Sequence, residues 1–272
     1  SSSTGSDATT APLDGMSGAA LGPAFDGAEV VAWLEGAGVE HQRFDDAAEL
    51  VDVVAGAIAG GAVVGWFEGR MEFGPRALGH RSILADPRSP TVQRELNLRV
   101  KGRESFRPFA PAVLAESASD WFDIDRPSPY MLFTFPVHRD RWVEVVDEPE
   151  DPLERVRAVR STIPACTHVD RSARVQTVHR ELSPRFHSLI RAFDELTGCP
   201  VLLNTSFNVA GEPIVATPEQ ALDCARRAHL DVLVVEDCVV RLTAATDDLA
   251  VARPAAHVGG SADLDQDLGV TR

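Results

Sequence analysis

The spacing of apolar and polar positions predicts helices and strands that follow one another along the chain. Residues 26–38 and 45–61 place apolar side chains at helical spacing and end in glycine, which is typical of helices. Residues 62–67, AVVGWF, are a short apolar run that predicts a buried strand. Helix-start residues at 86–90, followed by apolar residues three or four apart, predict a helix that ends near residue 100.

The second half of the chain continues this alternation. We expect strands at 109–115 and 131–137 and a charged surface connection at 140–160. After these we expect a strand at 173–178, a helix at 183–200, a strand at 201–208, a helix at 217–230 and one or two strands at 231–242. Because strands alternate with helices, the pattern indicates the α/β class.

Composition narrows the class of protein. With 44% hydrophobic residues among 272, the chain holds enough apolar material for a sizeable core. We predict one domain, residues 21–245, between flexible tails at 1–20 and 246–272. No apolar run approaches the roughly 18 residues of a membrane helix, and the first residues lack a signal peptide's features, so we expect a cytoplasmic location and no membrane partner. The four cysteines lack CxxC spacing and are expected to be buried thiols.

The chain is acidic, with a formal net charge of −15, yet residues 70–107 hold nine basic and only four acidic side chains. The overall negative charge argues against nucleic acid as a partner, because such binding depends on neutralising phosphates. A basic segment in an acidic body favours a small, multiply charged ligand.

Within that segment, residues 70–82 read RMEFGPRALGHRS. The glycines permit torsions closed to other residues, and Pro75 restricts the approach to Arg76. A rigid turn of this kind holds a guanidinium ready to bind phosphate with both arms, and Arg81 or Ser82 are candidates for further contacts. The alternative is a structural arginine that closes the turn by donating to carbonyl groups.

Lys101 is the only lysine in the chain. A compact ammonium can reach between phosphate oxygens where a planar guanidinium cannot, so we expect Lys101 to bind phosphate. Arg107 precedes a proline and must lie in an extended segment, which also makes it a candidate. The alternative for Lys101 is a solvated cation at a helix end.

Two later segments add polar candidates. Arg174 lies on a predicted strand and shares a face with Gln176, and an arginine in an apolar strand requires a carboxylate or a ligand as partner. His168 is either a ligand contact or a core histidine. At the end of the strand predicted at 201–208 stand three further candidates, Asn204, Ser206 and Asn208. Open α/β sheets place ligands at such ends, although turn formation also explains these residue types.

Several well-known signatures are missing from the sequence. There is no GxxxxGK[ST], GxGxxG, HExxH, GxSxG or cysteine cluster, so we assign no metal ligand to this chain. The residues alone therefore indicate a phosphate-binding pocket without naming a reaction.

Four motifs carry a resemblance to a known family. They are GRMEFGPRALGHRSILADPR, VKGRESFRPFAPAVL, IPACTHVDRSARVQTV and LLNTSFNVAGEPIV. Together, from about residue 21 to about 242, they resemble the C-terminal domain of ATP-dependent O-carbamoyltransferases, which modify antibiotics and nodulation factors. The resemblance implies a YrdC-like fold, a twisted mixed sheet flanked by helices.

The resemblance also implies an activity. Such a domain forms carbamoyl adenylate from carbamoyl phosphate and ATP with Mg²⁺. An actin/hexokinase-like partner domain or subunit, which holds a transition metal, then transfers the carbamoyl group to a hydroxyl acceptor. Arg76, Lys101 and Arg107 fall on positions implied to be catalytic, and Arg174 and Ser206 on positions implied to contact the substrates. Two alternatives stay open: a carbamoyl phosphate phosphatase, and a non-catalytic nucleotide-binding regulatory module.

One departure from the family pattern stands before Arg174. Relatives commonly have Gly-Thr where this chain has Arg171 and Ser172. Because arginine does not readily take a glycine torsion, we expect this turn to differ in shape, with an effect on His168 and Asp170.

Overall fold

The predicted alternation of helices and strands is present in the computed structural model, which describes residues 15–145, 151, 155, 156 and 158–242. The helices are α1 (Gly27–Gly36), α2 (Ala47–Ala59), α3 (Val92–Arg99), α4 (Ala118–Trp121), α6 (Pro184–Thr197) and α7 (Pro218–Arg227). The strands are β1 (Gln42–Arg43), β2 (Val64–Phe67), β3 (Arg81–Ala85), β4 (Ala110–Leu114), β5 (Thr134–Pro136), β6 (Ser172–Arg174), β7 (Gln176–Val178), β8 (Val201–Ser206), β9 (Val232–Val235) and β10 (Cys238–Arg241).

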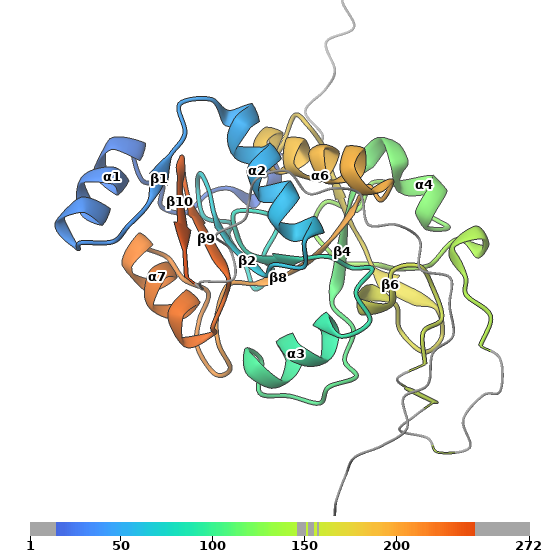
Figure 1. Cartoon of the computed structure of the whole chain (residues 1–272). Helices are drawn as coiled ribbons and strands as arrows, with labels where there is room; N and C mark the ends of the chain where they lie inside the picture. The colour runs from blue at the N-terminus through green and yellow to red at the C-terminus, as the bar shows by residue number, and fades with distance from the viewer. Residues whose placement is uncertain (1–14, 146–150, 152–154, 157, 243–272) are drawn as a thin grey trace, which may run out of the picture.

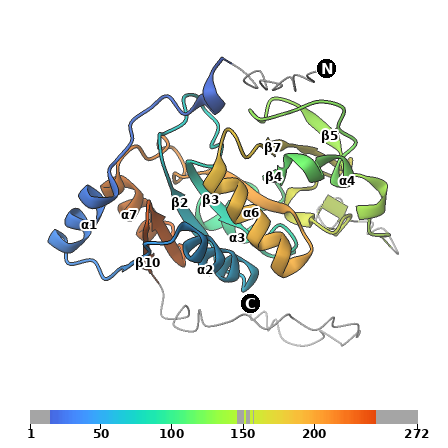
Figure 2. The same ribbon diagram turned by 90° about the horizontal axis from the view of Figure 1, so that it is seen from above.

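Eight of these strands form one mixed sheet in the order β1-β10-β9-β2-β3-β8-β4-β7, and β5 and β6 form a small second sheet. The pairs β2–β9 and β4–β7 are parallel, whereas the other pairs in the large sheet are antiparallel. Helices α2 and α6 pack together on one face, and α3 and α7 lie on the other (Figures 1 and 2). The predicted α/β class, a mixed sheet flanked by helices, is therefore confirmed.

Local sequence signals account for most helix ends. Asp26 and Asp46 accept hydrogen bonds from the first turns of α1 and α2, and Thr217 does the same for α7. Gly198 ends α6 in the left-handed conformation. Ser183, the residue before α6, forms no cap hydrogen bond with its side chain.

Several strands differ from their predictions, and the short strand β1 was not predicted. Strand β3 was missed, because its first residue is an arginine, a residue type that rarely lies inside a sheet. The single strand predicted at 173–178 is broken at Val175, since β6 pairs with β5 whereas β7 pairs with β4. Of the strand predicted at 131–137, Thr134–Pro136 form β5, and Val137 forms an isolated antiparallel bridge with Phe122.

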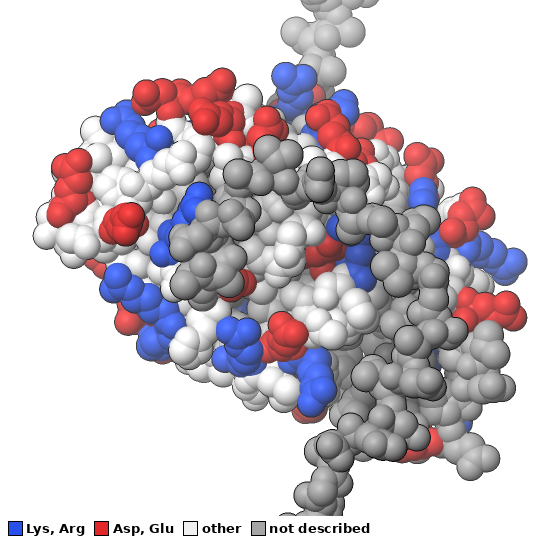
Figure 3. Space-filling model, in the orientation of Figure 1, with Lys and Arg blue, Asp and Glu red and all other residues white. Residues whose placement is uncertain are grey.

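Other sequence predictions have varied outcomes. All four cysteines are buried free thiols, as predicted. No helix in the described ranges is long and apolar enough to cross a bilayer. Much of the predicted tails, and part of the 140–160 connection, lies outside the described residues; within the N-terminal range, Ala19 is described and buried. On the face seen in Figure 3, basic and acidic side chains are interspersed.

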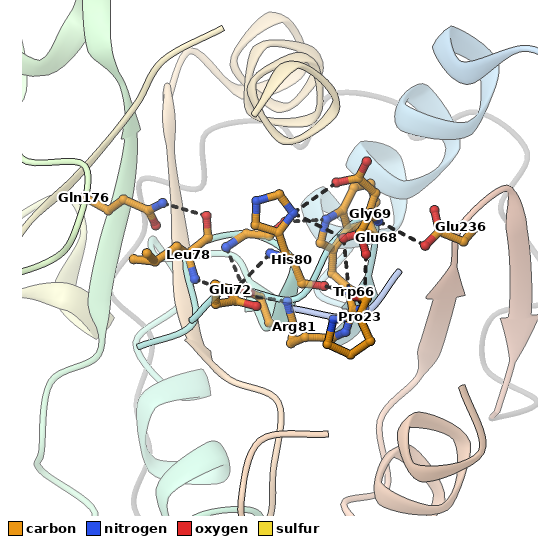
Figure 4. A network of polar contacts seen from close by, with 12 residues as sticks. Pro23, Trp66, Glu68, Gly69, Glu72, Leu78, His80, Arg81, Gln176 and Glu236 are labelled. Atoms are coloured by element: carbon orange, nitrogen blue, oxygen red, sulfur yellow. Dashed lines mark hydrogen bonds and ion pairs between the residues drawn. The ribbon is translucent and has the colours of Figure 1, made fainter. Parts of the chain in front are cut away.

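The turn that carries Arg76 is held by a buried carboxylate, that of Glu72, which is 2% exposed. Its Oε1 accepts hydrogen bonds from the backbone N–H groups of Leu78, His80 and Arg81, at 2.6, 3.4 and 3.3 Å. From the other side, Gln176 donates to the carbonyl of Leu78 at 2.7 Å (Figure 4). Hydrogen bonds to Glu72 through backbone N–H groups, and to Gln176 through the Leu78 carbonyl, therefore hold the end of the turn in place.

Arg81 is the second anchor and is fully buried. Its guanidinium donates to four carbonyl oxygens, those of Pro23, Glu68, Gly69 and His80, at 3.0–3.3 Å. It also stacks 3.5 Å above the centre of the Phe67 ring. The expectation that Arg81 contacts phosphate is wrong. The carbonyl-binding structural arginine considered for Arg76 is found five residues later.

Acidic side chains surround Arg81 and complete this network (Figure 4). Burial lowers the pKa of Arg81 to about 10, against the charges of Glu72, Glu236 and Glu68. Glu236 accepts a hydrogen bond from the N–H of Gly69 at 3.0 Å, and burial raises its pKa to about 7. Burial opposes protonation of His80, but its hydrogen bond to Glu68 and the charge of Glu72 outweigh this and raise its pKa.

Gly79→Ala should strongly destabilise the protein. Gly79 has φ +103°, and an added Cβ would lie 2.2 Å from the ring of Phe186. Overpacking costs about 1–3 kcal/mol and the torsion about 1–2 kcal/mol, which urea unfolding would measure. The matched control is Gly56→Ala in α2, where an added Cβ meets nothing within 4 Å; it should stabilise by about 0.5–1 kcal/mol. Equal stabilities of the two variants would contradict the expected clash.

Glu236→Gln should remove a pH-dependent loss of stability. The pKa of Glu236 is raised from 4.5 to about 7 on folding, so the folded state binds its proton more tightly. This contribution to the unfolding free energy is complete below pH 4.5 and is lost as pH rises through about 7. Glutamine retains an acceptor for Gly69 without the charge.

The stability of Glu236→Gln relative to wild type should therefore rise by up to about 3 kcal/mol between pH 4.5 and 8. Urea unfolding across this range measures the difference, with the exposed Glu40→Gln as control. Parallel stability curves for Glu236→Gln and wild type would refute the role given to Glu236.

Candidate functional site

Two adjoining cavities open at the edge of the sheet where β8 ends and β4 begins. The smaller, of about 270 Å³, lies among the turn at 75–77, Lys101 and the segment that follows β8. The larger, of about 520 Å³, extends toward residues 166–174. The two share the lining residues Arg76, Arg103, Pro108, Phe109, Ala110 and Arg174. A ligand in one cavity therefore lies beside a ligand in the other.

Cations dominate the shared wall. Arg76, Arg103 and Arg174 line both cavities, and Lys101 lines the smaller one. No Asp or Glu is among the described residues that line the smaller cavity. Burial, followed by the charges of Arg76 and Arg103, lowers the pKa of Arg174. Like charges held this close destabilise the empty site and attract anions.

Arg174 has a buried side-chain donor that lacks a hydrogen-bond partner among the described residues. It is half-buried at the end of β6, and its Nε is buried without a hydrogen-bond acceptor. Within the described part of the chain its guanidinium forms no hydrogen bond or ion pair. Since a buried donor without an acceptor is costly, an anion in the cavity would stabilise this arginine.

Arg103 is a site residue that the sequence reasoning missed. Its Nε donates to Asn97 Oδ1 at 2.6 Å, and its guanidinium lies 5.0 Å from the centre of the Phe109 ring. Asn97 is itself fully buried and donates to the carbonyls of Ser105 and Arg107, at 3.2 and 2.8 Å. One asparagine of α3 therefore sets the path of the segment that carries Arg103. The spacing Lys101-Gly-Arg103 was the available signal.

Lys101, Ser206 and Asn208, predicted separately, form one polar cluster at the edge of the smaller cavity. The Lys101 Nζ donates to the carbonyls of Ser206 and Asn208, at 2.6 and 3.0 Å, and contacts Ser206 Oγ and Asn208 Oδ1, at 3.1 and 2.7 Å. Burial and the charge of Arg103 lower its pKa to about 7. Lys101 thus organises the segment after β8, and is not a solvated helix-end cation.

Arg107 and His168 line only the larger cavity. The Arg107 side chain is 57% exposed and lies 3.4 Å from Glu104. The His168 Nδ1 lies 3.0 Å from Asp170 Oδ1, and the ring is half-exposed, so His168 is not a core histidine. Hydrogen bonds from Ser172, with a further one to His168, hold the pKa of Asp170 at about 2.

The turn before Arg174 keeps a glycine-like torsion despite its arginine. Arg171 has φ +64°, so the expectation that arginine would avoid this torsion is wrong. Its guanidinium lies 4.2 Å above the centre of the Trp142 ring, a contact that offsets the strain. Asp170 accepts hydrogen bonds from both the N–H and the hydroxyl of Ser172, which closes the turn.

Asn204 is among the residues that line the smaller cavity, with only 1% of its surface exposed. Its Nδ2 donates to the carbonyl of Ala77 and to Gln176 Oε1, at 3.2 and 2.8 Å.

Among the described residues, no group of three or more His, Cys, Asp or Glu side chains is arranged to hold a metal ion.

Several known proteins are similar in sequence to this chain. An uncharacterized protein of Synechocystis, sll1178, is 52% identical over 85% of this chain and 38% of its own length. Nodulation protein NolNO of Sinorhizobium fredii is 42% identical over 81% of this chain and 29% of its own. The 3'-hydroxymethylcephem-O-carbamoyltransferase of Amycolatopsis lactamdurans is 37% identical over 82% and 42%. The chain spans less than half the length of each.

Among solved structures, full-length HypF in its phosphate- and nucleotide-bound form matches 70% of this chain and 25% of its own, with a TM-score of 0.44 and 17% identity. Residues 55–242 match the family described as Carbamoyltransferase C-terminus, a range that includes every cation of the two cavities. With more than half of its residues inside that match, the chain belongs to the carbamoyltransferase C-terminal family.

Proposed function

We propose that this chain activates a carbamoyl group: it forms carbamoyl adenylate from carbamoyl phosphate and ATP, as part of an enzyme that carbamoylates a hydroxyl of a small-molecule acceptor. The guanidinium of Arg174, which has no partner among the described residues and lines both cavities together with Arg76 and Arg103, is the observation that carries the proposal. Family membership and a relative named as a cephem O-carbamoyltransferase support the group transferred.

The reaction balances in two steps. Water first cleaves carbamoyl phosphate to carbamate and inorganic phosphate. A carbamate oxygen then attacks the α-phosphorus of ATP, and pyrophosphate leaves as carbamoyl adenylate forms. Both donors are polyanions, so they approach each other only where fixed cations offset their repulsion. Mg²⁺ would enter with ATP, as it does in many phosphoryl-transfer sites.

The geometry suits two neighbouring anions. The smaller cavity fits a donor the size of carbamoyl phosphate, and the larger has room for a nucleotide. Arg76, Arg103 and Arg174 at the shared wall would contact phosphates from both sides. Lys101 and Ser206 would act from the far side of the smaller cavity, whereas Arg107 and His168 would act in the larger one. A carbamoyl phosphate phosphatase would need only the first step and only the smaller cavity.

The purified chain, given ATP, Mg²⁺ and carbamoyl phosphate, should release pyrophosphate only when all three are present. Arg174→Gln should weaken carbamoyl phosphate use by roughly 10- to 100-fold, because a charge-assisted contact is lost. Arg94→Gln, on the exposed side of α3, is the matched control. Phosphate release without any pyrophosphate would identify a phosphatase; pyrophosphate release independent of carbamoyl phosphate would exclude the proposed reaction.

Transfer to the acceptor is proposed to need a further, actin/hexokinase-like part, because the relatives extend well beyond the region matched here. When that part is separate, affinity must replace the high effective concentration of a covalent tether. The non-matching part of the Synechocystis relative should therefore bind this chain and co-elute with it in size-exclusion chromatography. Independent elution of the two folded proteins would count against a shared interface.

A further inference from the structure

Asn97 is a fully buried polar residue in α3, a helix whose other buried side chains are the apolar Val92 and Leu96. Asparagine is a poor helix former, and a buried amide is costly unless its polar atoms have partners. Leucine would serve both the helix and the core better. The reason for an amide at this position therefore lies in the contacts that it forms.

Two carbonyl groups orient this amide. Its Nδ2 donates to the carbonyl oxygens of Ser105 and Arg107, at 3.2 and 2.8 Å. Because carbonyl oxygens only accept, both amide hydrogens are used there and the oxygen Oδ1 is left for Arg103. Oδ1 accepts from Arg103 Nε at 2.6 Å, and the backbone carbonyl of Asn97 accepts from the Arg103 N–H at 3.1 Å. Asn97 thus holds both the backbone and the side chain of Arg103.

The guanidinium of Arg103 is fixed at its inner nitrogen and left open at its outer ones. Beyond the bond from Nε to Asn97, it lies 5.0 Å from the centre of the Phe109 ring. Its two terminal nitrogens form no hydrogen bond or ion pair with another described residue, and the side chain lines the wall shared by the two cavities. A guanidinium held in this way presents a pair of parallel donors to an anion.

Resting on the function proposed above, we propose that Asn97 is a positioning residue for phosphate binding, which aims the terminal nitrogens of Arg103 at the shared wall. Asn97 lines neither cavity, so it acts only through Arg103. A long side chain that is mobile in the free protein loses rotamer freedom when it binds a ligand, and this loss reduces affinity. Asn97 orders the arginine before the ligand arrives, so the ligand does not bear that cost.

A double-mutant cycle tests this role through ATP affinity. Isothermal titration calorimetry on the purified chain, with ATP and Mg²⁺, should show roughly 3- to 30-fold weaker binding in Asn97→Ala, because the arginine must then be ordered on binding. Arg103→Gln should weaken binding by roughly 10- to 100-fold. In the Arg103→Gln background, Asn97→Ala should cost less than about 2-fold, since the side chain that it positions is gone. Asn97→Leu repeats the cycle if the alanine variant does not fold.

Gln93→Ala is the matched control from the same helix. Gln93 donates to the carbonyl of Phe106 at 3.0 Å, so this variant removes a bond to the same segment without releasing an arginine side chain. Its ATP affinity should stay within about 2-fold of wild type. A loss as large as that of Asn97→Ala would show that support of the segment, and not the aim of Arg103, determines binding.

A purely structural asparagine would give another pattern. Asn97→Ala would then weaken ATP binding by the same factor in the wild-type and Arg103→Gln backgrounds, as independent sites do. Equal factors, or an unchanged ATP affinity in either single variant, overturn the role of Asn97 but not the proposed function. Failure of wild type to bind ATP would overturn both.

Discussion

The buried guanidinium of Arg81 is the interaction on which the rest of the site depends. It ties the segment at residue 23, the end of β2 and the start of β3 into one unit through carbonyl oxygens. Burying such a charge is tolerable only because both terminal nitrogens donate hydrogen bonds and because carboxylates lie close by. Breaking the unit would leave both a charge and several carbonyls without partners.

The neighbouring Glu72 extends this rigidity to the functional turn. One oxygen of its carboxylate, Oε1, accepts hydrogen bonds from three backbone N–H groups and so fixes the position where the turn of Arg76 ends. Arg76 itself is exposed and free of this network. These two roles require different arginines, because N–H groups that already donate to backbone carbonyls are not available to a ligand. One short motif therefore contains a structural arginine, Arg81, and an exposed arginine that lines both cavities, Arg76.

Around the cavities, like charges lie close together and a buried donor lacks a partner among the described residues, which lowers the stability of the folded protein. Three arginines line the wall that the two cavities share, and no Asp or Glu is among the described residues that line the smaller cavity. The Arg174 side chain has no partner within the described residues. Such groups lower the stability of the folded protein, and the proposed anionic substrates would offset this cost.

The sequence by itself determined the α/β class, most helix ends and most of the lysine and arginine residues that line the cavities. These follow from local causes: apolar spacing, capping side chains such as Asp26 and Thr217, and residue types suited to phosphate. Lys101, Ser206 and Asn208 were each identified from their own segments, but only the tertiary structure joins them in one cluster.

The tertiary structure also decided which arginine is structural and which is free to bind. Arg76 and Arg81 lie five residues apart in one motif, and their roles depend on long-range partners at residues 23, 67 and 72. Arg103 acquires its place from Asn97, and strand β3 is possible only because distant carbonyls satisfy its first side chain. Spacing along a chain reports the local backbone, whereas the satisfaction of a buried charge depends on groups brought together by folding.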